Sequence, residues 1–171
     1  VEACERLAEQ VRDETGREAL AAGCHVGRWA DCDALADRAL ERFGRVDVLV
    51  NNAGMSPLYS SLVEVTEDLW DKVLAVNLIG TMLFIKHVAP HMQARKLGSI
   101  VNTASVAGLR SGAGGNAYSA SKAGVVNLTM TAACDLGNDN VRVNAVCPGL
   151  VETGMTQAVF DYAHANEKAH K

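Results

Sequence analysis

The sequence predicts an α/β fold built on a parallel sheet. Segments whose apolar residues recur at helical spacing alternate with short apolar runs that fit buried strands. Residues 46–50 are almost continuously apolar, as in strands that helices cover on both faces of a sheet. Helices and strands alternate at a regular pitch, and 171 residues suffice for one domain with a core. We therefore expect a single α/β domain.

The first part of the chain is predicted to form two helices and a short strand. Residues 2–15 carry a helical apolar stripe, and Gly16 follows as a C-terminal stop. Residues 18–26 are a run of small and apolar residues that we interpret as a strand. The next helix is expected to start from Asp31 as its N-cap and to end at Gly44.

Longer helices and two further strands follow. The predicted elements are a loop at 56–65, a helix from Thr66 towards Pro90, a strand at 98–105, a helix at 117–136 that Gly137 stops, and a strand at 141–147. Thr66 is a suitable N-cap. Glu67 and Asp68 place negative charge in the first turn, where the helix dipole favours it.

The composition excludes several classes of protein. Hydrophobic residues make up 49% and charged residues 21%, as in ordinary soluble domains. A net charge of −4 without a basic stripe argues against nucleic-acid binding. The longest apolar run, residues 73–85, is interrupted by Asn77 and Gly80 and is too short to cross a bilayer. No signal peptide is recognised at the start, so we expect a cytoplasmic protein without nucleic-acid or membrane partners.

Neither the cysteines nor the histidines form a convincing metal site. The five cysteines are scattered without paired ligand spacing, and we expect reduced, mostly buried thiols at Cys4, Cys24, Cys32, Cys134 and Cys147. His87 and His91 stand four residues apart, which could suit a metal. No carboxylate or thiol accompanies them in sequence, so an exposed helix end is the favoured interpretation and no metal is expected.

Tyr118 and Lys122 form the pattern with the most chemical meaning. Four residues apart on a predicted helix, they share one face. A free phenol, with a pKa of about 10, is a poor base at neutral pH, but an ammonium group within about 4–6 Å lowers that pKa. The pair could therefore serve as a proton-transfer group. Because the spacing is common by chance, the pair alone also fits an exposed face of an ordinary helix.

Other signals place polar residues at the ends of predicted strands. One strand is followed by Asn51 and Gly54, another ends at Ser105, and a third precedes Pro148 and Gly149. In open parallel sheets, ligands bind outside the carboxyl ends of the strands. We therefore expect these segments and the Tyr118 helix to meet at one edge of the sheet.

These residues, in this order, resemble the short-chain dehydrogenase/reductase family. The resemblance extends over almost the whole chain and is carried by Asn51, Asn52, Ala53, Gly54, Asn77, Ser105, Tyr118, Lys122, Pro148 and Gly149. It implies a Rossmann-like doubly wound parallel sheet and hydride transfer between NAD or NADP and a small-molecule carbonyl or secondary alcohol.

The resemblance also implies a role for each catalytic position. Tyr118 would be the general acid/base, Lys122 would lower its pKa and bind the ribose, and Ser105 would hydrogen-bond the substrate oxygen. Asn77 would hold a water in a proton relay behind Lys122. Without the resemblance, Ser105 could simply end a strand, and Asn77 could be an amide in the core whose hydrogen bonds are satisfied.

Cofactor-binding positions follow from the same resemblance. The implied set is His25, Val26, Asn51, Ala53, Gly54, Tyr118, Lys122, Pro148, Gly149, Val151 and Thr153. Of these, Val151 and Thr153 would contact the nicotinamide amide. His25 departs from the family, which commonly has an aspartate there to accept from the adenine amino group. A neutral histidine can still accept one hydrogen bond, and Val26 would pack on the adenine ring.

The chain lacks parts that the family has. It opens with a helix and has no glycine-rich phosphate turn at the expected place. In the doubly wound order, residues 18–26 would be the third strand, so the first two strands and the last strand are missing. We expect residues 1–171 to be one partial dinucleotide-binding and catalytic domain, an internal piece of a longer protein. Residues 157–171 are predicted to start a helical lid-like segment.

A glycine-rich stretch elsewhere could be mistaken for the phosphate turn. Gly108, Gly112 and Gly114 have the right spacing between a strand and a helix. They lie, however, between Ser105 and Tyr118, where the family carries a flexible loop on the substrate side. We therefore do not assign them to phosphate.

The two long helices predict self-association. Both are apolar on more than one face, so each needs cover on two sides. In the resembled family the matching helices pair with those of a second subunit, and we expect a homodimer or homotetramer. The alternative function is a catalytically silent fragment or oligomerisation module. NAD and NADP stay undecided, because the residue that reads the ribose 2′ position would lie on a missing strand.

Overall fold

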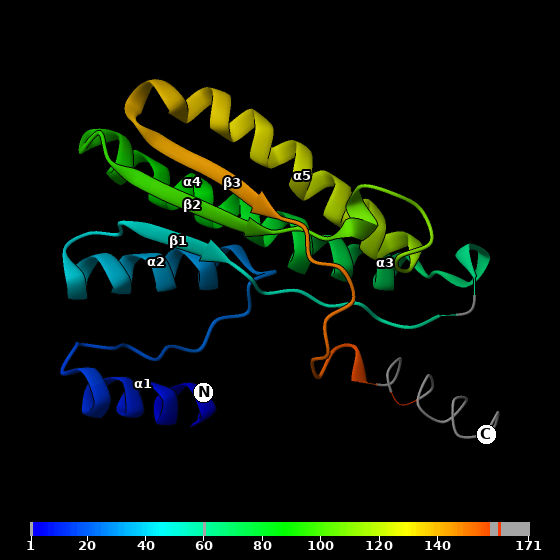
Figure 1. The fold of residues 1–171 in the computed structure, drawn as a ribbon, viewed down its shortest axis with the longest axis horizontal. Coiled ribbons are helices and arrows are strands. Elements are labelled where there is room, and N and C mark those ends of the chain that lie inside the picture. The colour runs from blue at the N-terminus through cyan, green and yellow to red at the C-terminus, as the bar shows by residue number, and fades with distance from the viewer. Residues whose placement is uncertain (1, 60, 158–160, 162–171) are drawn as a thin grey trace.

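A computed structural model describes residues 2–59, 61–157 and 161 of the chain (Figure 1). Its helices are α1 (Glu2–Thr15), α2 (Trp29–Phe43), α3 (Glu67–Leu74), α4 (Gly80–Ala94) and α5 (Asn116–Leu136). Its strands are β1 (Val48–Asn51), β2 (Gly98–Thr103) and β3 (Val141–Val146). The predicted lid-like segment at 157–171 falls almost entirely outside the described residues.

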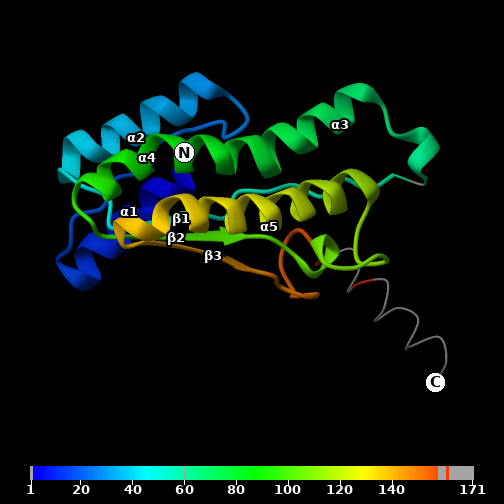
Figure 2. The ribbon, with the colours of Figure 1, turned by 90° about the horizontal axis from the view of Figure 1, so that it is seen from above.

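The three strands form one parallel sheet in the order β1-β2-β3. Helices α4 and α5 lie on one face of it, with α2 beside α4 (Figure 2). Met92 of α4, Ile100 of β2 and Val141 of β3 are almost fully buried in the core between these layers. The predicted α/β fold with an incomplete parallel sheet is confirmed.

Within the described residues, only one face of this sheet is covered by helices. Val48 and Val50 of β1 point to the other face and are 59% and 60% exposed. The expectation of cover on both faces, drawn from the apolar run at 46–50, is therefore not met in this structure. The side chains of residues 48–50 are apolar on both faces of β1. To bury the second face, further helices or strands would have to pack on it, and the described residues provide none.

The predicted strand at 18–26 is wrong. Residues 17–25 are extended or irregular and pair with no strand in the described part of the chain. A strand exists only where a neighbour satisfies its backbone groups, and β1 is paired on one side alone. The segment instead runs beside α1, held by hydrogen bonds from Arg12 to Ala19 and from Arg42 to Glu18 (Figure 1).

Helix boundaries mostly follow the predictions. Gly16 and Gly44 both adopt positive φ after α1 and α2, and Thr66 accepts from the Leu69 amide as the N-cap of α3. Helix α2, however, begins at Trp29, so Asp31 lies in its first turn. There the Asp31 carboxylate accepts a hydrogen bond from the His25 amide, 3.0 Å away.

Helices α3 and α4 join through a π-helical turn at Ala75–Ile79 and form one continuous helix. It passes through Pro90, which lies on an exposed side where water can satisfy the carbonyl that loses its partner. Judged by length and composition alone, this 28-residue helix is the one span among the described residues that could cross a membrane. Core helices of soluble proteins pass the same test, and 44% of its apolar window is buried inside the protein.

The expected burial of the cysteines and the expected setting of His87 both need correction. Only Cys32 is buried; there, burial raises the pKa of the thiol to about 12. His87 lies between the carboxylates of Asp33 and Asp37 on α2, 3.1 and 3.0 Å from its two ring nitrogens. Carboxylates do accompany it, from a helix far away in sequence. Among the described residues, no group of three or more His, Cys, Asp or Glu side chains is arranged so that it could hold one metal ion.

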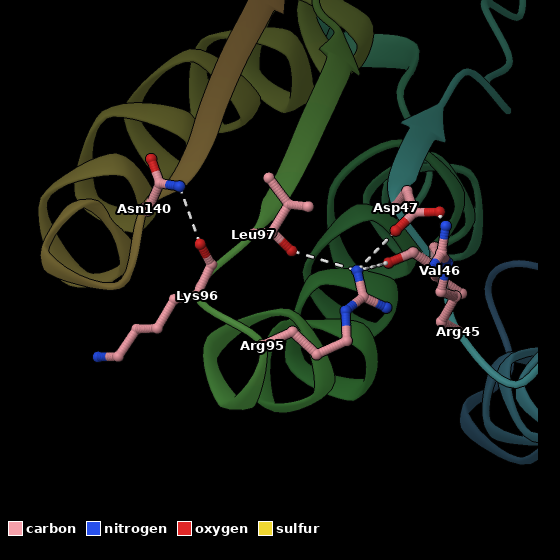
Figure 3. Close-up of polar contacts among 7 residues, drawn as sticks. All are labelled: Arg45, Val46, Asp47, Arg95, Lys96, Leu97 and Asn140. Carbon is pink, nitrogen blue, oxygen red and sulfur yellow. Dashed lines mark hydrogen bonds and ion pairs between the residues drawn. The ribbon is translucent and has the colours of Figure 1, made fainter.

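At the amino end of the sheet, Arg95 joins three segments (Figure 3). Its Nη2 donates to the Asp47 carboxylate at 2.8 Å and to the carbonyls of Val46 and Leu97 at 3.2 Å each. Arg45 also reaches Asp47, at 3.0 Å, but its side chain is 67% exposed against 29% for Arg95. Both arginines therefore bind the Asp47 carboxylate, Arg45 from solvent and Arg95 from a partly buried position.

We expect Arg95→Met to lower the free energy of unfolding by about 1–3 kcal/mol, because it leaves carbonyls at the sheet end without a donor. Arg45→Met is the matched control and should cost less than about 1 kcal/mol, since exposed ion pairs contribute little. Urea unfolding followed by circular dichroism measures both. Equal losses in the two variants would contradict the role given to Arg95.

Candidate active site

Lys122 is the most deeply buried charged residue of the candidate site. Its side chain runs from α5 to the end of β2, where Nζ donates to the Thr103 carbonyl at 2.6 Å. Only 4% of the residue is exposed, and this burial lowers the pKa of the Lys122 ammonium. One hydrogen bond to a carbonyl leaves Nζ with two further donors for a ligand.

Tyr118 lies one helical turn before Lys122. The Lys122 Nζ is 5.7 Å from the centre of the Tyr118 ring, as the shared face predicts. The ring also packs closely on the preceding loop, since a Cβ at Gly114 would lie 2.8 Å from the Tyr118 Cδ1. Glycine at 114 therefore leaves the space that the ring occupies.

Ser105 follows β2 by two residues and is 7% exposed. It precedes a single 3-10 turn, Val106–Gly108, and its Oγ accepts from the Ala107 amide at 3.1 Å. That bond uses one lone pair and leaves the hydroxyl proton free to donate. Ala107 in turn lies beside Gly114, which packs against Tyr118, so Ser105 and Tyr118 border the same small region.

The glycine-rich stretch serves close packing in this structure. A Cβ at Gly108 would lie 2.6–2.7 Å from backbone atoms of Lys122 and Ala123, so only glycine lets the turn after Ser105 touch α5. Gly114 makes room for Tyr118 in the same way. These contacts account for Gly108 and Gly114 without a phosphate ligand. Gly112 would have no atom within 4 Å of an added Cβ and instead adopts a positive φ of 77°, which suits glycine.

Asn77 sits in the π-helical turn and is fully buried. Its Oδ1 accepts from the Met55 amide at 2.8 Å, and its Nδ2 donates to the Met55 carbonyl at 2.9 Å and the Ser121 hydroxyl at 3.0 Å. Both N–H groups are therefore used. A relay water would have to bind the remaining lone pair of Oδ1 or the main chain, so the relay stays a prediction.

Two further polar residues support the site and were not among the predicted ones. Ser121 links Asn77 to the Tyr118 carbonyl, to which its hydroxyl donates at 2.6 Å. Asn102, buried in β2, accepts from Asn51 at 2.9 Å and donates to Thr129 at 2.9 Å. An asparagine in the middle of a buried strand is a recognisable signal, because such an amide needs partners.

Beside β1, an apolar cavity of about 230 Å³ adjoins the residues predicted to line adenosine. Val26, Asn51 and Ala53 lie along its wall. Gly54 lies farther along, where a Cβ would be 3.5 Å from both the Asn77 Oδ1 and the Lys122 Nζ. The segment after β1 therefore runs from the cavity to the buried ammonium.

The expected hydrogen bond from adenine to His25 does not fit this arrangement. The His25 Nδ1 already accepts from the Gly27 amide at 3.2 Å, so a neutral ring carries its proton on Nε2. That nitrogen donates; it would meet an adenine ring nitrogen rather than the amino group. Val26 lies close against Gly80 of α4, where a Cβ would fall 2.4 Å from the Val26 carbonyl oxygen.

The segment after β3 reaches the site through one backbone contact. The Pro148 carbonyl accepts from the Val106 amide at 3.0 Å, next to Ser105. Gly149, Val151 and Thr153 are exposed, and Thr153 is bonded within its own turn to Thr156. Pro148 is thus joined to the site, whereas the hydrogen bonds among the described residues include none from Val151 or Thr153 to Tyr118 or Lys122.

A family model described as short chain dehydrogenase matches residues 1–163. The chain belongs to the short-chain dehydrogenase family. It thus belongs to a family of oxidoreductases, in agreement with the resemblance drawn from its motifs.

Relatives of this chain include a dehydrogenase/reductase from a mammal and a reductase from a bacterium. Dehydrogenase/reductase SDR family member 4 of Oryctolagus cuniculus is 39% identical over 138 residues, which are 81% of this chain and 53% of the relative. The 3-oxoacyl-[acyl-carrier-protein] reductase FabG of Thermotoga maritima is 45% identical over 129 residues, 75% and 52% of the two chains. The chain spans about half the length of the curated relatives it matches.

Two solved structures share its fold. NAD+-bound xylitol dehydrogenase aligns with a TM-score of 0.83 at 36% identity, over 90% of this chain and 58% of its own. Levodione reductase aligns with a TM-score of 0.86 at 34% identity, over 92% and 61%.

The residues around Lys122 fit part of a nicotinamide dinucleotide. The free donors of the buried Lys122 ammonium suit ribose hydroxyls, whereas the cavity beside Val26 is lined mainly by apolar side chains. No glycine-rich turn from a strand into a helix other than the packed stretch before α5 occurs in the described ranges.

We expect Gly108→Ala to destabilise the fold by about 1–3 kcal/mol, because backbone atoms of α5 cannot move away as a side chain could. Gly137→Ala is the control: φ is −61° and no atom lies within 4 Å of the new Cβ. It should leave stability unchanged or raise it by up to about 1 kcal/mol. Thermal unfolding compares the two, and a neutral Gly108→Ala would contradict the close contact.

A second prediction concerns Lys122, whose ordinary pKa of 10.5 is lowered by burial in the folded state. Between the lowered pKa and 10.5, the unfolded chain binds more protons, so raising the pH stabilises the wild type relative to Lys122→Met. Below the lowered pKa, the difference in free energy of unfolding between the wild type and Lys122→Met does not change with pH. Urea unfolding of both proteins from pH 7 upwards measures it. A difference that stays constant or falls up to pH 10.5 would contradict the burial of the ammonium.

Proposed function

We propose that this chain carries the catalytic half of an enzyme that transfers hydride between NAD or NADP and a carbonyl or secondary alcohol. The observation that supports this best is the meeting of Lys122, Tyr118 and the Ser105 turn at the end of β2. Family membership and the NAD+-bound structural neighbour support the choice of cofactor. Both NAD and NADP are candidates.

In carbonyl reduction, a bound nicotinamide would supply the hydride for the carbonyl carbon. The chain's own residues handle the oxygen. The free Ser105 proton holds the substrate oxygen by a hydrogen bond, and the Tyr118 hydroxyl gives that oxygen its proton as the C–O double bond becomes a single bond. In alcohol oxidation, Tyr118 takes the proton back.

Lys122 would act on Tyr118 and on the ribose at once. A positive charge beside the phenol stabilises the phenolate that exists after proton donation, and burial strengthens the effect because little water screens it. Its two remaining donors are free for ribose hydroxyls. The Thr103 carbonyl holds the ammonium in position for both roles.

The substrate class rests on the relatives alone. Their names give 3-oxoacyl thioesters, xylitol and levodione as compounds for testing. We also propose a homodimer or homotetramer as the assembly. Met130 on α5 is 54% exposed, in line with a helix that lacks cover on one side.

The alternative is that these residues are catalytically silent and serve folding or assembly. In its favour, the described residues contain no glycine-rich turn from a strand into a helix other than the stretch that packs on α5. Titration of NADH and NADPH fluorescence against the chain separates the two proposals. Micromolar binding supports an active chain, and no binding at millimolar dinucleotide supports a silent one.

We expect Tyr118→Phe to lower turnover by about 10²–10⁴-fold, because the ring remains packed on Gly114 while the proton donor is lost. NADH oxidation with levodione and with acetoacetyl-coenzyme A measures it in the protein expressed from its complete coding sequence. Dinucleotide binding and the free energy of unfolding, measured on the same variant, serve as controls and should not change. Turnover equal to the wild type would overturn the mechanism.

A further inference from the structure

A second tyrosine starts the helix that carries Tyr118. Gly115, the N-cap of α5, has no side chain with which to accept from the first-turn amides. Tyr59, from the loop after β1, supplies an acceptor instead, because its phenolic oxygen accepts from the Ala117 amide at 2.8 Å. The cap of α5 thus comes from a residue 58 positions away in sequence.

The fit between Tyr59 and Gly115 is close. A Cβ at Gly115 would lie 2.8 Å from the Tyr59 Oη and 3.0 Å from its Cζ, so the ring rests directly on the glycine. Gly114 accommodates Tyr118 in the same way, at 2.8 Å. Adjacent glycines therefore accommodate two different tyrosine rings at the start of the helix.

Tyr118 depends on this first turn more than Lys122 does. It is the third residue of α5, in the turn where helices fray most easily. Lys122 lies one turn farther in and is anchored to the sheet through Thr103. A shift of the first turn would therefore move the phenol while the ammonium stays in place.

We propose that Tyr59 is a positioning residue: by capping α5 it sets where the Tyr118 hydroxyl lies relative to Lys122 and the Ser105 turn. The proposal rests on the proposed function, in which Tyr118 exchanges the proton. Tyr59 itself need not touch substrate or cofactor for this role.

Tyr59→Phe is the sharpest test, because it keeps the ring on Gly115 and removes only the accepting oxygen. We expect turnover to fall by about three- to thirtyfold, the range that corresponds to one lost cap, with the KM for the dinucleotide unchanged. The assays use levodione and acetoacetyl-coenzyme A in the protein expressed from its complete coding sequence. Leu58→Ala, in the same loop and 85% exposed, is the matched control and should behave as the wild type.

A rescue experiment separates capping from substrate contact. Tyr59→Ala opens the space over Gly115, whose φ of −64° and ψ of 159° suit a serine N-cap. We expect the double variant Tyr59→Ala, Gly115→Ser to regain most of the turnover that Tyr59→Ala loses. If the serine restores nothing, Tyr59 acts by contact with the substrate and the positioning role is overturned.

Two measurements do not depend on turnover. In the protein labelled with 3-fluorotyrosine, Tyr59→Phe should shift the ¹⁹F signal of Tyr118, and the Ala117 amide should exchange its hydrogen faster. A wild type inactive on both compounds would count against the proposed function alone. An unchanged Tyr118 signal with unchanged exchange would refute the role of Tyr59 whether or not the protein is active.

Discussion

The contact on which the site depends is the buried ammonium of Lys122 against the Thr103 carbonyl. Burying a charge is costly unless hydrogen bonds replace its water, and the carbonyl at the end of β2 supplies one of them at 2.6 Å. Together with the hydrogen bond from Asn102 to Thr129, this contact holds α5 against the sheet. Gly108, which touches the backbone of Lys122, brings the Ser105 turn to the same place. Ligand-binding groups therefore gather where the strands end.

Local patterns in the sequence were enough to predict most of the fold. The ends of α1 and α2 followed from Gly16 and Gly44, whose positive φ only a glycine adopts without strain. The segment 18–26 was mispredicted because a strand needs a partner, and no local pattern reports whether one is present. The start of α2 was placed too late, since Asp31 accepts from the His25 amide within the first turn instead of preceding the helix.

In the site, too, contacts between residues close in sequence could be predicted, whereas contacts between distant residues could not. Tyr118 and Lys122 are one helical turn apart, so their proximity follows from helix geometry alone. The hydrogen bonds of Asn77 to Met55 and Ser121, and the contact of Tyr59 with Ala117, join residues 22 to 58 positions apart. Their partners depend on how the elements pack. The proton position on His25 likewise depends on the Gly27 amide, which no spacing rule indicates.

The uncovered side of β1 has a consequence for where the sheet can be extended. As the outermost strand, β1 presents a row of backbone donors and acceptors that no strand among the described residues satisfies, flanked by the exposed Val48 and Val50. Such an edge is a template for adding extended segments from other molecules. Within the described residues, β1 is therefore the edge at which an extended segment would add to the sheet.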